Sequence, residues 1–221
     1  MQPDDPRSWR PQRFGRRNFR HLKDAVVEPL WEGIRVLVHR GPDGGLALLD
    51  VDGDEIGSEF LEVVAAIDAA LEAETAVLDG YLTRQATLPG EGTLIVSAEP
   101  PSKTEMARHL LVGGLARPEA EPIPPDPDRQ PIAFVAIDLL LVDDEPLLDV
   151  PLLERKRILE SILSETPLVR RSPYVRPPID TWLVSWRSHG FRSLAYKTAN
   201  GRYVPGKTSD EWTSVAMPAN R

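Results

Sequence analysis

The apolar run from Ile132 to Val142 constrains the fold of this chain more than any other stretch. Asp138 is its only polar residue. No apolar run in the chain approaches the roughly 18 residues that a membrane span needs. A strand that is apolar on both of its alternating faces has to be covered on both sides. We therefore expect residues 132–142 to form a central strand of a soluble domain, buried on both faces.

Shorter strand and helix signals occupy most of the remaining chain. Strands are expected at 34–39, 46–51, 75–82, 93–97, 193–197 and near Trp212, and helices at 58–71, 104–111, 151–162 and 178–189. Turn residues at 41–45 join the first two strands as a hairpin, Ser58 is expected to cap the first helix, and Asp79-Gly80 interrupts the third strand. This mixed order without internal repeats predicts an α+β domain of antiparallel sheets flanked by helices.

The domain organisation follows from two segments outside this pattern. We expect a basic N-terminal arm at 1–24 and one domain at 25–221, with a proline-rich linker at 117–131 inside it. Prolines deny the linker helix and sheet hydrogen bonds. The strand and helix pattern resumes after the linker, which therefore does not divide the chain into two domains.

The expected arm is the most basic part of a chain whose formal net charge is −8. Its cations are interleaved with Trp9, Phe14 and Phe19, a combination suited to phosphate contacts and base stacking. The alternative is an arm that packs back on the acidic body. The candidate nucleic-acid-binding residues are Arg10, Arg13, Arg16, Arg17 and Arg20.

Cysteine and histidine usage excludes several kinds of chemistry. The sequence has no cysteine and four widely separated histidines. Disulfides, thiolate catalysis and cysteine–zinc sites are therefore excluded, and no metal site is predicted. The lack of cysteine fits a cytoplasmic protein. The N-terminus has no apolar signal-peptide core, and no membrane partner is expected.

Residues 28–35 read Glu-Pro-Leu-Trp-Glu-Gly-Ile-Arg, which resembles the Glu-Pro-Lys-Trp-Asp-Gly-x-Arg motif of covalent nucleotidyltransferases. The resemblance is greatest to the ligase domain of bacterial end-joining DNA ligases, which are ATP-dependent. Tyr203-Val-Pro-Gly-Lys-Thr-Ser-Asp-Glu-Trp212 is similar to another motif of that family, and matching segments run from about residue 26 to about residue 216. The resemblance implies the nucleotidyltransferase-like fold shared by DNA ligases and mRNA capping enzymes. We expect no OB-fold domain, since the sequence stops at Arg221.

Where the sequence departs from the family motifs, it loses the reactive groups. Leu30 stands at the position of the lysine that attacks ATP, and a leucine cannot act as a nucleophile. Tyr81 and Arg192 stand at the two carboxylate positions. Further cationic positions of the family are occupied by Val51, Ser214 and Ala216. The resemblance therefore implies that no residue is left in the catalytic roles.

Four residues keep the family's nucleotide-contacting types. Glu28 resembles the adenine-contacting glutamate, Phe134 the stacking aromatic, Arg35 a ribose- or phosphate-contacting arginine, and Lys197 the phosphate lysine. They imply weak binding of ATP or AMP and no firmly bound cofactor. The alternative is that Phe134 is a core residue, that Glu28 and Lys197 are exposed, and that Arg35 pairs with a nearby acid.

Arg192 has two interpretations of its own. It could form a forked contact to a phosphate, since a guanidinium matches phosphate geometry. We favour the other interpretation, in which Arg192 pairs with Glu28, Glu32 or Asp79 and fills the site.

The sequence thus predicts a catalytically inactive, ligase-like adenylation domain with a binding role in DNA repair. Its expected partners are DNA, through the arm, and a DNA repair protein. One alternative is an active ligase or nucleotidyltransferase that uses an unforeseen residue or a partner chain. The other is a purely structural interaction protein.

Overall fold

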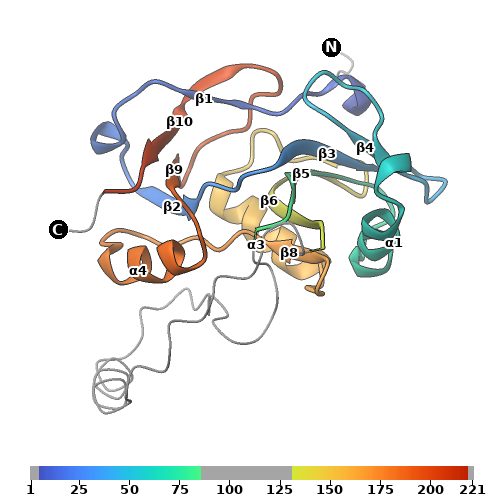
Figure 1. Ribbon diagram of the computed structural model, residues 1–221. Coiled ribbons are helices and arrows are strands. Elements are labelled where there is room, and N and C mark those ends of the chain that lie inside the picture. The colour runs from blue at the N-terminus through green and yellow to red at the C-terminus, as the bar shows by residue number, and fades with distance from the viewer. Residues whose placement is uncertain (1–4, 86–130, 219–221) are drawn as a thin grey trace, which may run out of the picture.

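The computed structural model of the protein describes residues 5–85 and 131–218 (Figure 1). The strand expected at 93–97, the helix expected at 104–111 and nearly all of the linker expected at 117–131 lie outside these ranges. The described strands form two sheets.

The smaller sheet pairs strands from the early part of the chain with strands from its late part. Its order is β1-β10-β9-β2, with β1 at Arg13–Gly15, β10 at Thr208–Ala216, β9 at Ser193–Thr198 and β2 at Ala25–Pro29. β9 pairs antiparallel with both neighbours, whereas β1 pairs parallel with β10.

The larger sheet contains the hairpin and the central strand. Its order is β4-β3-β5-β6-β7, with β4 at Leu46–Leu49, β3 at Ile34–Arg40, β5 at Ala76–Thr83, β6 at Ala133–Val142 and β7 at Glu145–Pro146. β8, at Val169–Arg171, pairs parallel with β6. The α+β prediction is confirmed, and most of the pairing is antiparallel as expected.

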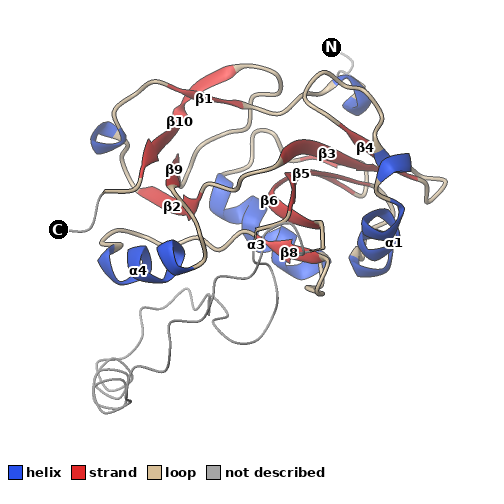
Figure 2. Ribbon diagram, viewed as in Figure 1, coloured by secondary structure: helices blue, strands red, loops and turns tan. Residues whose placement is uncertain are grey.

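Three α-helices and three short 3₁₀ turns complete the described part. They are α1 (Leu61–Ala70), α3 (Leu152–Ile162), α4 (Asp180–Ser188), η1 (Pro6–Ser8), η2 (Phe19–His21) and η3 (Gly57–Glu59). In Figure 2, α1 and α3 lie on one side of the larger sheet. Within the described ranges, none of the helices has the length and apolar character to cross a membrane.

β6 is the doubly buried central strand that the sequence predicts. Val135 and Ile137 belong to the core between the two sheets, which continues beneath α4. Phe134 and Ala136, on the alternate face, belong to the core beneath α1 and α3. Full burial of a large apolar side chain stabilises a fold by about 1.5–3 kcal/mol. Both faces of this strand therefore contribute to stability.

The interruption expected at Asp79-Gly80 is a register shift between β5 and β6. A Cβ atom on Gly80 would lie 2.4 Å from Cε2 of Phe134 and 2.5 Å from the Val135 carbonyl oxygen. The lack of a side chain at Gly80 therefore leaves room for the Phe134 ring of β6 to lie against β5. The irregularity leaves Asp79 and Asp138 as register partners in the middle of the sheet.

The start of the first helix differs from the prediction. Ser58 lies in η3, and α1 begins at Leu61 without a side-chain cap. The Glu55 carboxylate accepts hydrogen bonds from the backbone N–H groups of Gly57, at 2.7 Å, and Leu48, at 3.3 Å. Glu55 thus satisfies backbone donors in the turn that leads to the helix, and the capping role given to Ser58 is wrong.

Candidate functional site

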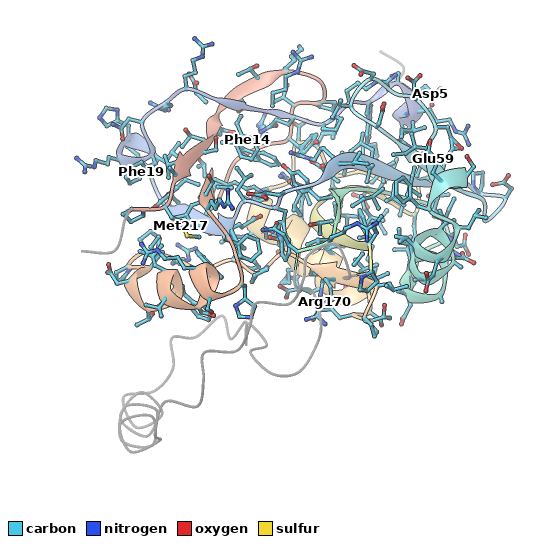
Figure 3. The ribbon with its side chains drawn as sticks, in the orientation of Figure 1. Asp5, Phe14, Phe19, Glu59, Arg170 and Met217 are labelled. Carbon is cyan, nitrogen blue, oxygen red and sulfur yellow. The ribbon has the colours of Figure 1, made fainter. Side chains whose placement is uncertain are left out.

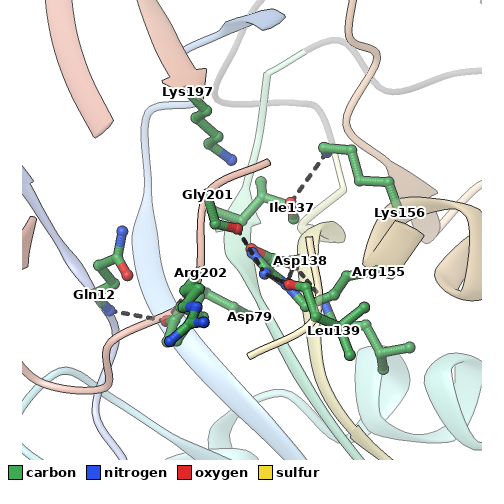
Figure 4. A network of polar contacts seen from close by, with 12 residues as sticks. Gln12, Asp79, Ile137, Asp138, Leu139, Arg155, Lys156, Lys197, Gly201 and Arg202 are labelled. Atoms are coloured by element: carbon green, nitrogen blue, oxygen red, sulfur yellow. Dashed lines mark hydrogen bonds and ion pairs between the residues drawn. The ribbon is translucent and has the colours of Figure 1, made fainter. Parts of the chain in front are cut away.

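Seven ionisable side chains from both sheets and from α3 meet between the sheets, and we call them the charge cluster. They are Glu28, Arg35, Asp79, Asp138, Arg155, Lys156 and Lys197, of which Asp79, Asp138, Arg155, Lys156 and Lys197 are labelled in Figure 4. Arg35 has 10% of its side-chain surface exposed and each of the others 3% or less. Charges buried to this degree are stable only when they are paired and hydrogen-bonded.

Glu28 connects two lysines within the charge cluster. Its Oε2 accepts a hydrogen bond from Nζ of Lys197 at 2.9 Å, and its Oε1 lies 2.8 Å from Nζ of Lys156. Lys156 also donates to the backbone carbonyl of Ile137 at 3.1 Å. The Lys197 ammonium lies 4.2 Å from the centre of the Trp212 ring, within the range of a cation–π contact. Glu28 and Lys197 therefore already satisfy each other.

Asp79 is held by an arginine and a tyrosine. Nε and Nη2 of Arg35 donate to its two oxygens at 2.5 and 2.6 Å, and the Tyr203 hydroxyl donates at 2.7 Å. Nη1 of Arg35 donates to the Tyr81 hydroxyl at 3.0 Å. Burial alone would lower the pKa of Arg35, but Asp79 outweighs it and raises that pKa well above its ordinary value. Arg35 is thus a fixed cation.

Asp138 and Arg155 form the most buried pair, with no exposed side-chain surface on either residue. Nε and Nη2 of Arg155 donate to the two carboxylate oxygens at 2.8 and 2.7 Å. Its Nη1 donates to the carbonyls of Val150 at 2.5 Å and Gly201 at 3.1 Å. Burial opposes the charge on Asp138, yet Arg155 outweighs this and lowers the pKa of the carboxyl below its ordinary value.

The paired state of these carboxylates bears on whether the site fits a divalent cation. Asp79 and Asp138 each give both oxygens to a guanidinium. Among residues 5–85 and 131–218, no group of three or more His, Asp or Glu side chains is placed to hold a metal ion. A hard cation such as Mg²⁺ needs several free oxygen ligands. The described residues do not fit a magnesium–triphosphate complex.

Two expectations for the site residues need correction, and the first concerns Arg192. It was expected to fill the site by pairing with Glu28, Glu32 or Asp79. Its side chain is exposed, and Glu28 and Asp79 are paired instead with the lysines and with Arg35. Arg192 directly precedes β9, and its backbone carbonyl accepts a hydrogen bond from the Met217 N–H.

The second correction concerns Phe134. It is fully buried in the core beneath α1 and α3, on the face of β6 that points away from the charge cluster. The ring therefore has no open surface on which an adenine could stack. Glu28, Arg35 and Lys197 do come together, because Arg35 and Lys197 both lie over the Trp212 ring. The alternative in which Phe134 is core and Arg35 pairs with an acid describes the structure, except that Glu28 and Lys197 are buried.

Tyr81 borders the charge cluster through Arg35, and Leu30 follows two residues after Glu28 in the sequence. Leu30 directly follows β2, is half-buried and donates its N–H to the Ser193 carbonyl at 2.9 Å. Tyr81 is buried, and its ring lies 5.0 Å from the Arg35 guanidinium carbon. Burial raises the pKa of Tyr81, so its hydroxyl stays protonated and cannot replace a carboxylate as an anion.

The described part of the basic N-terminal arm, residues 5–24, packs largely against the rest of the domain. Trp9 and Gln12 are buried, and β1 continues the smaller sheet. The Arg10 guanidinium donates hydrogen bonds to the carbonyls of Arg7, Trp9 and Asp52. The donors of this candidate DNA contact are therefore occupied by hydrogen bonds within the protein. The other four candidates, Arg13, Arg16, Arg17 and Arg20, are exposed.

Sequence reasoning missed Arg155 and Lys156, which lie in the helix expected at 151–162. A signal was present in the spacing. Leu152, Arg155, Lys156 and Leu159 are the buried residues of α3, and positions i, i+3, i+4 and i+7 share one helix face. The two cations on the apolar stripe therefore required buried acidic partners, which β2 and β6 supply.

Lys197 gives the charge cluster a measurable pH dependence. Burial lowers its pKa from 10.5 to about 8, against the opposing effect of Glu28. Between these values the unfolded chain keeps a proton that the folded protein has released, so stability rises with pH through this window. In urea titrations at pH 8, 9 and 10, Lys197→Met should remove a slope of up to about 1.4 kcal/mol per pH unit. Equal slopes in both proteins would contradict this assignment.

Comparisons with known proteins agree on one family. The family model described as ATP dependent DNA ligase domain matches residues 16–215. A probable DNA ligase of Streptomyces griseus is 30% identical over 201 residues, which cover 88% of this chain and 36% of that protein. The chain therefore spans about a third of the length of this curated relative.

Solved structures share the fold. The ligase domain of M. tuberculosis LigD matches with a TM-score of 0.63 and 21% identity, over 95% of this chain and 60% of that one. A mycobacterial DNA ligase D complexed with ATP and MES matches with a TM-score of 0.63 and 19% identity over the same shares. The architecture is thus the nucleotidyltransferase-like fold of DNA ligases.

Proposed function

Because the chain belongs to the family of ATP-dependent DNA ligase domains, we propose that it is a catalytically inactive adenylation domain with a DNA-binding role in DNA repair. The family membership supports an adenylation-domain scaffold. The site residues support the loss of its chemistry.

The observation that carries the proposal is the combination of Leu30 with a fully paired charge cluster. Leu30 offers no lone pair where the family's lysine attacks ATP. Lys197, a family lysine that remains, is 1% exposed and bonded to Glu28. A nucleophile has to reach the phosphorus atom of ATP, so this lysine does not replace the missing one.

The charge cluster also argues against tight binding of ATP or AMP. A phosphate could reach Arg35 or Lys197 only by replacing Asp79 or Glu28, the acids that hold them. Breaking a buried ion pair is costly. We therefore propose that any binding of ATP or AMP is weak and does not proceed to transfer.

Incubation with ATP labelled at the α-phosphate and Mg²⁺ should give no labelled band on a denaturing gel. Leu30→Lys should also give none, because Tyr81 and Arg192 still stand at the carboxylate positions. An active DNA ligase of the family, labelled in parallel, is the control. A denaturation-resistant band on the unaltered protein would establish the alternative, an active nucleotidyltransferase.

DNA binding is supported by the family and by the exposed arginines of residues 13–20. Charges on a surface attract the phosphate backbone, and the resulting affinity falls with salt. These cations oppose the overall charge of −8, so the remainder of the surface repels DNA and favours contact on this side.

The absence of cysteine from the sequence supports a cytoplasmic location.

A further inference from the structure

We propose that a surface groove between Phe19 and Arg176 is a docking site for an unpaired, single-stranded segment of DNA. This inference rests on the proposed DNA-binding function and specifies the form of DNA and the place where it binds. The groove has a volume of about 480 Å³, and its walls include Phe19, Arg20, Leu22, Asp24, Arg176 and Tyr196.

The groove is separate from the charge cluster. Tyr196 directly precedes Lys197 in β9, and successive side chains of a strand point to opposite faces. Lys197 pairs with Glu28 in the charge cluster, whereas Tyr196 packs against Phe19 of η2. A ligand in the groove would therefore leave the buried ion pairs in place.

An aromatic pair forms one wall of the groove. The ring centres of Phe19 and Tyr196 are 4.6 Å apart, with an angle of 36° between the rings. Phe19 is half-buried at the edge of the molecule (Figure 3). The backbone holds it there, because the Asn18 side chain caps η2 through the Arg20 N–H at 3.0 Å. A half-exposed ring on a fixed turn can stack against a nucleobase.

Positive charge lies beside this ring. The Arg20 guanidinium carbon lies 5.8 Å from the centre of the Phe19 ring. Arg16 and Arg17 precede it on the same segment, and all three arginines are exposed. Arg176 on the opposite wall forms an ion pair with Asp24. Asp24 thus neutralises Arg176, and the phosphates beside a stacked base would meet the exposed Arg16, Arg17 and Arg20.

The combination of ring and cations decides between occupants. An acidic peptide would use the arginines but would leave the aromatic wall without a partner. A base pair inside a duplex has both faces covered by its neighbours, whereas an unpaired base has a free face to stack. Single-stranded DNA uses both features.

The test is fluorescence anisotropy with a labelled oligothymidylate of about 12 nucleotides, the length range that such grooves cover. The full chain should bind it, and Phe19→Ala should weaken the affinity by roughly tenfold, because one stacked base is lost. Phe19→Tyr should retain the affinity. Leu61→Ala, at an exposed residue of α1, is the matched control and should change nothing.

Arg20→Gln keeps the proposal testable if Phe19→Ala fails to fold, because Arg20 is exposed and lies outside the core. It should weaken binding and lower the salt dependence by about one phosphate contact. Unchanged affinity in both variants would overturn the proposal, and so would equal displacement of the oligonucleotide by an oligoglutamate peptide.

A duplex of the same length separates this inference from the proposed function. If the chain binds the duplex and Phe19→Ala leaves binding of the single strand unchanged, the groove is wrong and DNA binding stands. If it binds neither form, both proposals fail.

Discussion

Arg155→Met should lower the free energy of unfolding by about 3–5 kcal/mol, because it leaves the Asp138 carboxylate buried without its partner. The side chains of this pair have no exposed surface. Methionine fills part of the volume but cannot donate the hydrogen bonds that Arg155 gives to Asp138, Val150 and Gly201. Urea denaturation followed by the fluorescence of the five tryptophans measures the change.

The loss should depend on pH in a defined direction. In the unaltered protein the pKa of Asp138 lies below 3.8, so its stabilisation is complete above that value and is lost as the pH falls through the folded value. Without Arg155, burial raises the pKa of this carboxyl, and protonation then relieves the penalty. The difference between the two proteins should therefore be larger at pH 7 than at pH 4.

Two further variants show whether the pair itself is responsible. Arg157→Met changes an exposed arginine of the same helix and should leave the unfolding midpoint unchanged. The double variant Asp138→Leu with Arg155→Met replaces the pair by apolar groups and should recover most of the stability. If Arg155→Met were as stable as the unaltered protein, water or a structural rearrangement would have to replace the hydrogen bonds that Asp138 loses.

Glu28→Gln should also destabilise the fold by about 3–5 kcal/mol, because it leaves two buried ammonium groups without their shared carboxylate. Lys156 and Lys197 lie 2.8 and 2.9 Å from its oxygens. The glutamine amide has nearly the same shape as the glutamate carboxylate, so the loss of stability reports the missing charge and not a change in packing. Thermal unfolding at pH 7 gives the comparison.

This variant distinguishes the structural role of Glu28 from the nucleotide contact implied by the family resemblance. A residue that mainly contacts adenine would lose AMP affinity with little loss of stability. Glu154→Gln removes the carboxylate of an exposed ion pair with Arg157 and should leave the melting temperature unchanged. If Glu28→Gln were equally harmless, the ion pairs of Glu28 with Lys156 and Lys197 would not stabilise the fold.

Most of the strand framework could be predicted from local patterns. The apolar run at 132–142 became β6, the hairpin became β3 and β4, and Asp79-Gly80 marked the register shift in β5. These features depend on neighbours within a few residues, where alternation and turn chemistry act directly. The start of α1 could not be predicted in this way, because Glu55 satisfies the preceding turn from outside the expected cap position.

The candidate site could be predicted only in part. Motif similarity selected Glu28, Arg35 and Lys197, which do meet. It also placed Phe134 on the wrong face of β6 for adenine stacking and expected Arg192 in the site, because a one-dimensional match does not say where a side chain points. Alternation along β6 puts Phe134 with Ala136, beneath the helices.

The sequence alone determined the family and the doubly buried central strand. These depend on residue identity and order, which folding does not change. Only the tertiary structure decided which charges neutralise one another, because Glu28 finds its partners 128 and 169 positions along the chain, at Lys156 and Lys197. Buried charges require partners, but the partner is chosen by the packing of sheets and helix and not by sequence distance.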